Sequence, residues 1–140
     1  IVCSHKDSDK EIEDFLMHEE VSFSSVDLTR SSPKEIINYY ASIDLSLGMR
    51  KHSQMIAFGL NKPIFSLISH DEVKFFLRDI GYEEYGSDME NDNFTDVVEK
   101  FLLDFHKNEK KIKKNLKNAQ EKIWSETMNN FHKIKKLIKI

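Results

Sequence analysis

The sequence predicts an α/β fold, in which a mainly parallel sheet of four or five strands carries helices on both faces and long helices follow at the C-terminus. Short apolar runs alternate along the chain with segments whose apolar residues recur at helical spacing. The segments between successive runs are long enough to hold the crossover helix that joins two parallel strands. Only 4 glycines and 2 prolines occur, which favours long elements and short loops.

The composition excludes several classes of protein. With 140 residues, 39% hydrophobic and 32% charged, the chain is long enough to bury a core and too apolar for a disordered segment. The net charge of −3 argues against a nucleic-acid partner, and no apolar run reaches the ~20 residues of a transmembrane helix. Cys3 is the single cysteine, so there is no internal disulfide framework and we expect a cytoplasmic location.

The first elements can be read from the N-terminus. Residues 1–4 predict a buried strand, which makes Cys3 an inert core thiol, and the lack of an initiator methionine indicates a fragment of a longer protein. A helix follows, with Asp7 or a neighbouring Ser8 or Asp9 as its cap. Residues 21–28 alternate in part between apolar and polar side chains and predict a second strand.

Strong start and stop signals mark the later helices. At residues 31–35 two serines precede a proline, and a glutamate follows closely, which is typical of a capped helix start. The remaining predicted elements are a helix over 71–80 that ends at Gly81, a short edge strand within 82–88, and a helix over 94–106.

The domain organisation follows from these elements. Residues 1–106 are predicted to form one Rossmann-like α/β domain, and residues 107–140 a helical extension that packs on it. The extension is rich in lysine, which also suits a nucleic-acid or membrane surface. Because its lysines alternate with glutamates, the solvated face of an amphipathic helix is the better interpretation.

The stretch around residues 43–68 is the centre of the predicted fold. An apolar run over 43–47 ends at Gly48, helical spacing follows over 54–60, and Pro63 stops that helix just before a second apolar run. This order predicts strand, turn, helix and strand. In open parallel sheets ligands bind where a strand's carboxyl end meets the start of the next helix.

The polar residues at this junction suit an anionic ligand. Arg50 offers a planar, permanently charged fork for carboxylate or phosphate, and unpaired N–H groups at the helix start favour negative charge. His52 can transfer a proton near neutral pH and is the candidate catalytic residue. The candidate substrate-binding residues, from this junction and the loop after the next strand, are Gly48, Arg50, Lys51, Ser53, Ser69 and His70.

Other kinds of site lack support in the sequence. The six histidines form no His-x-x-x-His pair and there is no Cys-x-x-Cys pair, so no metal site is predicted. Neither a glycine-rich phosphate loop nor a nucleophile elbow occurs, and no cofactor is predicted. His5 follows the first strand as His52 and His70 follow later ones, which is typical of a cleft and also of ordinary exposed loops.

The motif Gly48-Met49-Arg50-Lys51-His52-Ser53, followed by an apolar helix and Lys62-Pro63-Ile64, resembles the polysaccharide pyruvyl transferase family. The resemblance covers about residues 20–105. It implies the carboxyl-terminal half of a two-domain protein of the GT-B type, whose missing N-terminal half completes the active site. It further implies transfer of a pyruvyl group from phosphoenolpyruvate to hydroxyls of a surface-polysaccharide sugar, with Arg50 holding the donor's phosphate or carboxylate and His52 acting on a proton.

Two departures from the family pattern keep other functions open. Lys51 stands where the family usually has leucine, and Ser69 and Glu72 stand for a tyrosine and a lysine in the following loop. One alternative is a GT-B glycosyltransferase that uses a nucleotide sugar, with Glu72 near the ribose. Another is a non-catalytic α/β interaction domain, in which Arg50 and His52 do not converge on a pocket.

Overall fold

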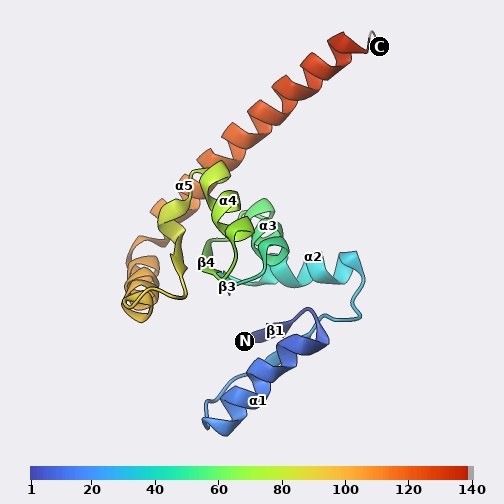
Figure 1. The fold of residues 1–140 in the computed structure, drawn as a ribbon. Helices are drawn as coiled ribbons and strands as arrows, with labels where there is room; N and C mark the ends of the chain where they lie inside the picture. The colour runs from blue at the N-terminus through green and yellow to red at the C-terminus, as the bar shows by residue number, and fades with distance from the viewer. Residues whose placement is uncertain (139–140) are drawn as a thin grey trace. The chain divides into compact units, whose positions relative to one another are not determined.

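The computed structural model describes residues 1–138 and shows a mixed α/β protein with parallel strands and a long C-terminal helix (Figure 1). The chain divides into two compact units, residues 1–39 and the part from Tyr40 onward. In the described part, the five strands pair in two small parallel sheets, one of two strands and one of three. The predicted α/β class and parallel pairing are therefore confirmed, while the strands are shared between two sheets instead of one.

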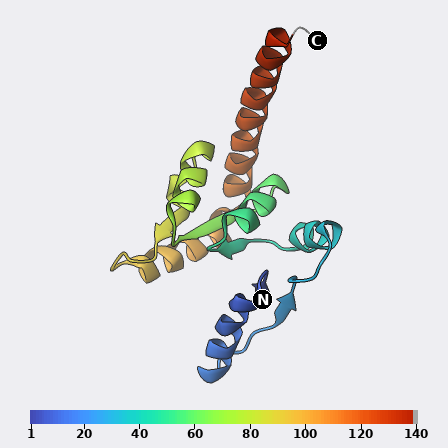
Figure 2. The same ribbon diagram turned by 45° about the vertical axis from the view of Figure 1, so that its right-hand side comes forward.

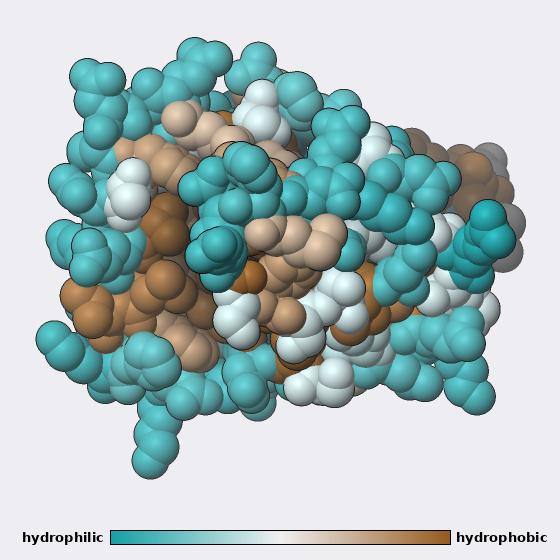
Figure 3. Space-filling view, turned by 90° about the horizontal axis from the view of Figure 1, so that it is seen from below, coloured by the Kyte–Doolittle hydropathy of each residue, from teal (hydrophilic) through white to brown (hydrophobic). Residues whose placement is uncertain are grey.

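The first unit holds the two-stranded sheet. Strand β1 (Val2–Ser4) pairs in parallel with β2 (Ser25–Asp27), and the short 3-10 helix η1 (Asp7–Asp9) and helix α1 (Lys10–His18) connect them. Both strands were predicted, but β2 is shorter than the apolar pattern indicated. Helix α1 has no buried residue. Figure 3 shows apolar side chains mixed with polar ones on the face of the molecule that is seen from below.

Asp9 stabilises the turn into this helix in a way that differs from the predicted cap. Its Oδ2 accepts hydrogen bonds from the backbone N–H groups of His5 (3.0 Å) and Lys6 (3.1 Å). The carboxylate therefore satisfies donors that precede η1, instead of capping the start of α1.

Helix α2 (Pro33–Ser42) begins as the sequence predicts. The Glu35 carboxylate accepts bonds from the backbone N–H and the hydroxyl of Ser32, and the Ser32 hydroxyl accepts one from the Glu35 backbone N–H at 3.4 Å. This reciprocal capping box satisfies donors that have no partner inside the helix. The same bonds lower the pKa of Glu35.

The second unit is built on a β-α-β-α-β segment. Strands β3 (Ser46–Gly48), β4 (Ile64–Ile68) and β5 (Gly86–Asp88) lie side by side in that order and are all parallel. Helix α3 (Lys51–Gly59) joins the first two, and α4 (Asp71–Ile80) lies between the last two. Strand β5 is the predicted edge strand.

Helices cover both faces of this three-stranded sheet (Figure 2). On one face the ring of Phe65 in β4 lies 4.6 Å from the ring of Phe101 in α5 (Phe94–Leu137). The next residue along the strand, Ser66, points to the other face and bonds to Gln54 of α3. Alternate side chains of a strand point to opposite faces, so β4 is buried from both sides.

Two helix ends match the sequence signals closely. Gly81 follows α4 with φ of 66° and ψ of 40°, the left-handed conformation that glycine adopts without strain. Helix α5 loses helical geometry at Asn108, where φ is −125° and ψ is 21°. The break separates the predicted helix over 94–106 from the C-terminal helical segment. Whether residue 106 is also a domain boundary stays a prediction.

Candidate functional site

The junction between β3 and α3 carries the polar motif. Arg50 is the N-cap residue of α3, with an extended backbone (φ −90°, ψ 121°). The helix begins at Lys51, three residues earlier than the apolar spacing indicated, so Lys51, His52 and Ser53 form its first turn. Their backbone N–H groups belong to the set that has no partner within a helix, which makes this turn suitable for an anion.

Gly48 leaves room for the side chain of Gln54, which lies very close to its Cα atom. It is the last residue of β3, and a Cβ atom at this position would lie 2.6 Å from Nε2 of Gln54. The amide of Gln54 is fully buried; it donates to the Ser46 hydroxyl at 3.1 Å and accepts from the Ser66 hydroxyl at 3.4 Å. This buried polar network fixes the start of α3 against β3 and β4.

Ser53 has a structural role at the helix start. Its hydroxyl donates to the backbone carbonyl of Arg50 at 2.7 Å, and the residue is only 8% exposed. The hydroxyl proton is thus used inside the protein. A substrate could reach Ser53 only through its backbone N–H or its remaining lone pair.

The loop after β4 supplies the second group of predicted residues. Ser69 and His70 are both exposed, and His70 is the N-cap residue of α4. Gly48 of β3 is in register with Ser66 of β4, so the carboxyl ends of the two strands meet at the same edge of the sheet. The two loops that hold the candidate residues therefore leave this edge together.

An ion pair connects the two helices that follow these loops. Nζ of Lys51 lies 3.2 Å from Oε2 of Glu72, and the two side chains are 32% and 74% exposed. Lys51 was predicted to bind substrate, and both Lys51 and Glu72 were expected to differ from the pattern of the family that the sequence resembles. The structure brings the two together, which neither prediction contained.

The two histidines at this edge are accessible. His52 and His70 are both exposed, and within residues 1–138 no hydrogen bond or ion pair involves either imidazole. Such rings remain available for proton transfer or ligand binding. His5 belongs to the first unit, where its Nε2 lies 3.7 Å from the Cys3 sulfur; burial raises the pKa of that thiol.

The sequence analysis did not predict the buried hydrogen-bond network of Gln54. The signal was present, because Gln54, Ala57 and Phe58 are spaced i, i+3, i+4 and all are buried. A glutamine in such a row needs buried partners, and a serine is available on each neighbouring strand.

A cavity of about 390 Å³ lies away from these loops, near the amino ends of β4 and β5. Aromatic rings form much of its wall, and charged residues of α5 surround it. No sequence motif pointed to this place. Its lining includes Phe65, Glu84, Tyr85, Lys100, Phe101, Asp104, Asn108 and Lys111.

The described residues were compared with what a metal site and a membrane-spanning helix require. Within residues 1–138, no group of three or more histidine, cysteine, aspartate or glutamate side chains is arranged to hold a metal ion. Among the same residues, no helix combines the length and apolar character needed to cross a membrane.

No protein-family model, curated protein or solved structure matches the chain.

Proposed function

We propose that the chain is part of a pyruvyl-transferase-like enzyme that binds phosphoenolpyruvate at the carboxyl ends of β3 and β4. The acceptor is a sugar of a surface polysaccharide. The observation that carries the proposal is the contact between Lys51 and Glu72, which joins the first turn of α3 to the first turn of α4. Both turns belong to the segment that resembles the polysaccharide pyruvyl transferases.

The ion pair also neutralises the acidic charge of Glu72, which would otherwise disfavour an anionic donor at this place. An acidic residue beside an anionic donor is unfavourable when its charge is not compensated. Here Glu72 lies against Lys51, and the family's residues at these two positions are lysine and leucine. The pair is neutral, so Glu72 adds no uncompensated negative charge beside Arg50, whose guanidinium is suited to phosphate or carboxylate.

The chemistry assigns roles to the remaining residues. One sugar hydroxyl adds to the central carbon of phosphoenolpyruvate while the methylene carbon gains a proton. The second hydroxyl then displaces inorganic phosphate from the same carbon, so that the bond between this carbon and the phosphate oxygen breaks and the second hydroxyl proton leaves with the phosphate. Arg50 and the N–H groups of the first turn of α3 hold the leaving phosphate. His52 gives or takes the proton, and Ser69 and His70 contact substrate from the second loop.

The proposal extends to the domain organisation of the chain and to an N-terminal half that would complete the enzyme. Residues 1–106 would form a Rossmann-like half of a GT-B-like protein, with residues 107–140 as its helical extension. The N-terminal half would supply the acceptor side of the cleft. The chain alone would then bind donor weakly and show no transfer.

One alternative enzyme remains a specific competitor. A GT-B glycosyltransferase would use an acidic residue soon after β4 to bind the ribose of a nucleotide sugar, and Glu72 lies in the first turn of α4. Its ion pair with Lys51 would have to open first. A non-catalytic α/β interaction domain is the third candidate, and it requires no ligand at this edge.

The test is calorimetric titration of phosphoenolpyruvate into the chain and into the longer protein that contains it. We expect binding that Arg50→Ala abolishes and that Arg78→Ala, an exposed arginine on α4, leaves unchanged. Binding of a uridine diphosphate sugar without phosphoenolpyruvate binding would favour the glycosyltransferase. If neither ligand binds the longer protein, the interaction domain becomes the better proposal.

A further inference from the structure

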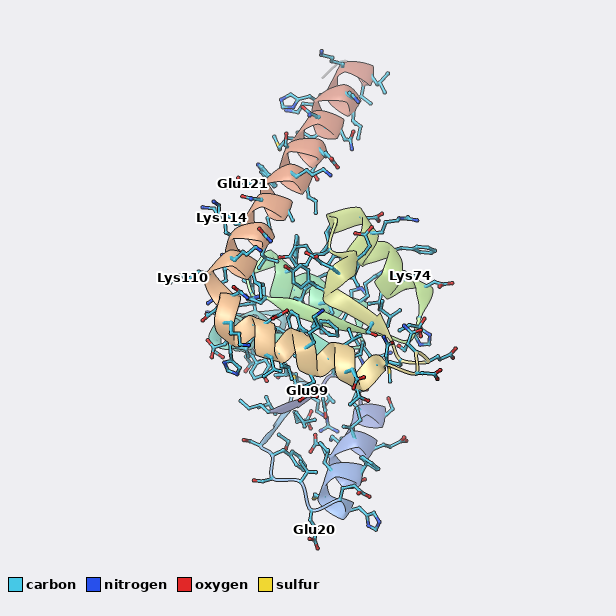
Figure 4. All side chains as sticks on the ribbon, turned by 90° about the vertical axis from the view of Figure 1, so that its left-hand side faces the viewer. Glu20, Lys74, Glu99, Lys110, Lys114 and Glu121 are labelled. Atoms are coloured by element: carbon cyan, nitrogen blue, oxygen red, sulfur yellow. The ribbon has the colours of Figure 1, made fainter. Side chains whose placement is uncertain are left out.

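The C-terminal part of α5 carries an apolar face that no described residue of the second unit, 40–138, covers. The helix leaves the sheet near Gln120, whose side chain bonds to the carbonyl of Phe58, and then extends alone (Figures 1 and 4). Beyond that point Trp124 is 67% exposed and Phe131 50% exposed. Ile134, Leu137 and Ile138 are exposed as well. An amphipathic helix of this kind is stabilised chiefly by packing its apolar face.

These residues follow a heptad pattern, in which the a and d positions form the contact seam of a coiled coil. Trp124, Phe131 and Ile138 occupy a positions, and Thr127 and Ile134 occupy d positions. The flanking e and g positions hold the other apolar residues of the segment. These are Met128 at e, and Ile123 and Leu137 at g.

We propose that this face binds the same face of a second copy of the chain, as an antiparallel two-helix coiled coil over residues 121–138. In an antiparallel pair the a residues of one helix meet d residues of the other. Centring the pair near Asn129 places Trp124 against Ile134 of the second copy and Phe131 against its Thr127. Because the interface is two-fold symmetric, each of these contacts occurs twice.

The flanking positions fit the same register. Antiparallel coiled coils bring g positions opposite g positions and e positions opposite e positions. At g, Ile123 meets Leu137 of the second copy. At e, Met128 meets its own equivalent, and Glu121 meets Lys135. A single register therefore gives most of the apolar residues apolar partners, packs Phe131 against Thr127, and joins opposite charges.

The charge pair favours a second copy over a contact within one chain. Glu121 and Lys135 are 14 residues apart on one helix, about 21 Å at 1.5 Å per residue, so they cannot touch within the same segment. No ion pair of either residue occurs within residues 1–138. The Lys135 ammonium lies over the Phe131 ring at 5.0 Å, which places it at the border of the apolar face.

The interface is short, so the dimer should be weak. Two helical segments of this length bury less than the roughly 800 Å² per partner of a stable complex. We therefore expect a dissociation constant in the micromolar range, measurable by dilution.

Trp124 provides a direct probe, because it is the single tryptophan of the chain. Analytical ultracentrifugation should show a monomer–dimer equilibrium, and tryptophan emission should shift to shorter wavelength over the same concentration range. Phe131→Asp should give a monomer with unshifted emission. Asn129→Asp adds the same charge on the outer face of the helix and should leave the dimer intact.

A charge exchange tests the register. Lys135→Glu or Glu121→Lys alone should weaken the dimer about tenfold, since each turns two attractive pairs into repulsive ones. The double variant should restore the wild-type dissociation constant. As matched controls, Lys136→Glu and Glu126→Lys change the same charges on the outer face and should have little effect.

The outcomes separate this proposal from its alternatives. A chain that stays monomeric at high micromolar concentration, with constant emission, overturns it and leaves the face to another part of a longer protein or to a different partner. A dimer that Phe131→Asp does not affect overturns it too. A dimer that Phe131→Asp dissociates but that the double charge variant fails to restore excludes the antiparallel register.

Discussion

Lys51 and Glu72 form an ion pair of 3.2 Å between the first turn of α3 and the first turn of α4. These elements follow different strands, and 21 positions separate the two residues in the sequence (72 − 51). Both residues would depart from the pattern of the polysaccharide pyruvyl transferases, the family to which we propose that the chain is related. Their contact suggests that the two departures compensate each other, since the acidic residue is placed where the lysine can neutralise it.

Removing the acidic partner should strengthen anion binding at this edge. In Glu72→Gln, Lys51 loses its counter-charge and becomes available, so we expect phosphoenolpyruvate affinity to rise severalfold at low ionic strength. The free energy of unfolding should change by less than about 1 kcal/mol, because exposed ion pairs contribute little. Calorimetry at two salt concentrations and urea unfolding measure the two effects.

Asp71→Asn is the matched control for this change. It removes one exposed negative charge from the neighbouring residue, which has no ion pair within residues 1–138. Equal gains in affinity from both variants would mean that only the net charge matters. The ion pair would then have no specific role in ligand binding.

The buried amide of Gln54 should be important for stability. Gln54→Ala leaves a void and removes the partner of the Ser46 and Ser66 hydroxyls, so we expect unfolding to become easier by about 2–4 kcal/mol. The neighbouring Met55→Ala changes a side chain that is 45% exposed and should shift stability by less than about 1 kcal/mol. Similar losses in both variants would argue against the network as the cause.

Gly48 should tolerate no side chain while Gln54 is present. In Gly48→Ala the new Cβ atom would lie 2.6 Å from Nε2 of Gln54, so the buried amide has to move and its hydrogen bonds to Ser46 and Ser66 are disturbed. We expect a clear loss of stability, and a smaller loss when the same substitution is made in Gln54→Ala. A double-mutant cycle by urea unfolding gives this coupling, and additive losses would contradict the steric explanation.

The features that the sequence predicts well are encoded by residues close together in the chain. The Ser32–Glu35 capping box and the left-handed Gly81 both follow from a few adjacent residue types. The predicted start of α3 was too late, because the first turn, Lys51 to Ser53, is polar and the N-cap residue Arg50 makes no side-chain capping hydrogen bond. Apolar spacing cannot detect such a turn.

The features that were not predicted depend on distant residues. The Lys51–Glu72 pair requires knowing that β3 and β4 are adjacent and in register, and the Gln54 network requires two strands and a helix at once. The division of five strands into two sheets likewise depends on pairing, which apolar runs do not specify.

Tyr82 should make stability fall at alkaline pH. It is 3% exposed, and its hydroxyl donates to the carbonyl of Ile112 in α5 at 3.3 Å. Burial raises its pKa above the ordinary value of 10.0, and the nearby Tyr85 and Glu84 add to the shift. Because the folded pKa lies above the unfolded one, the contribution of Tyr82 is complete below pH 10 and is lost progressively as the pH rises beyond it.

Tyr82→Phe should lower stability by about 1 kcal/mol at pH 7, through the lost hydrogen bond, and should reduce the alkaline decline. Urea unfolding between neutral and strongly alkaline pH measures both effects. An equally steep decline in the variant would assign the alkaline loss to other groups.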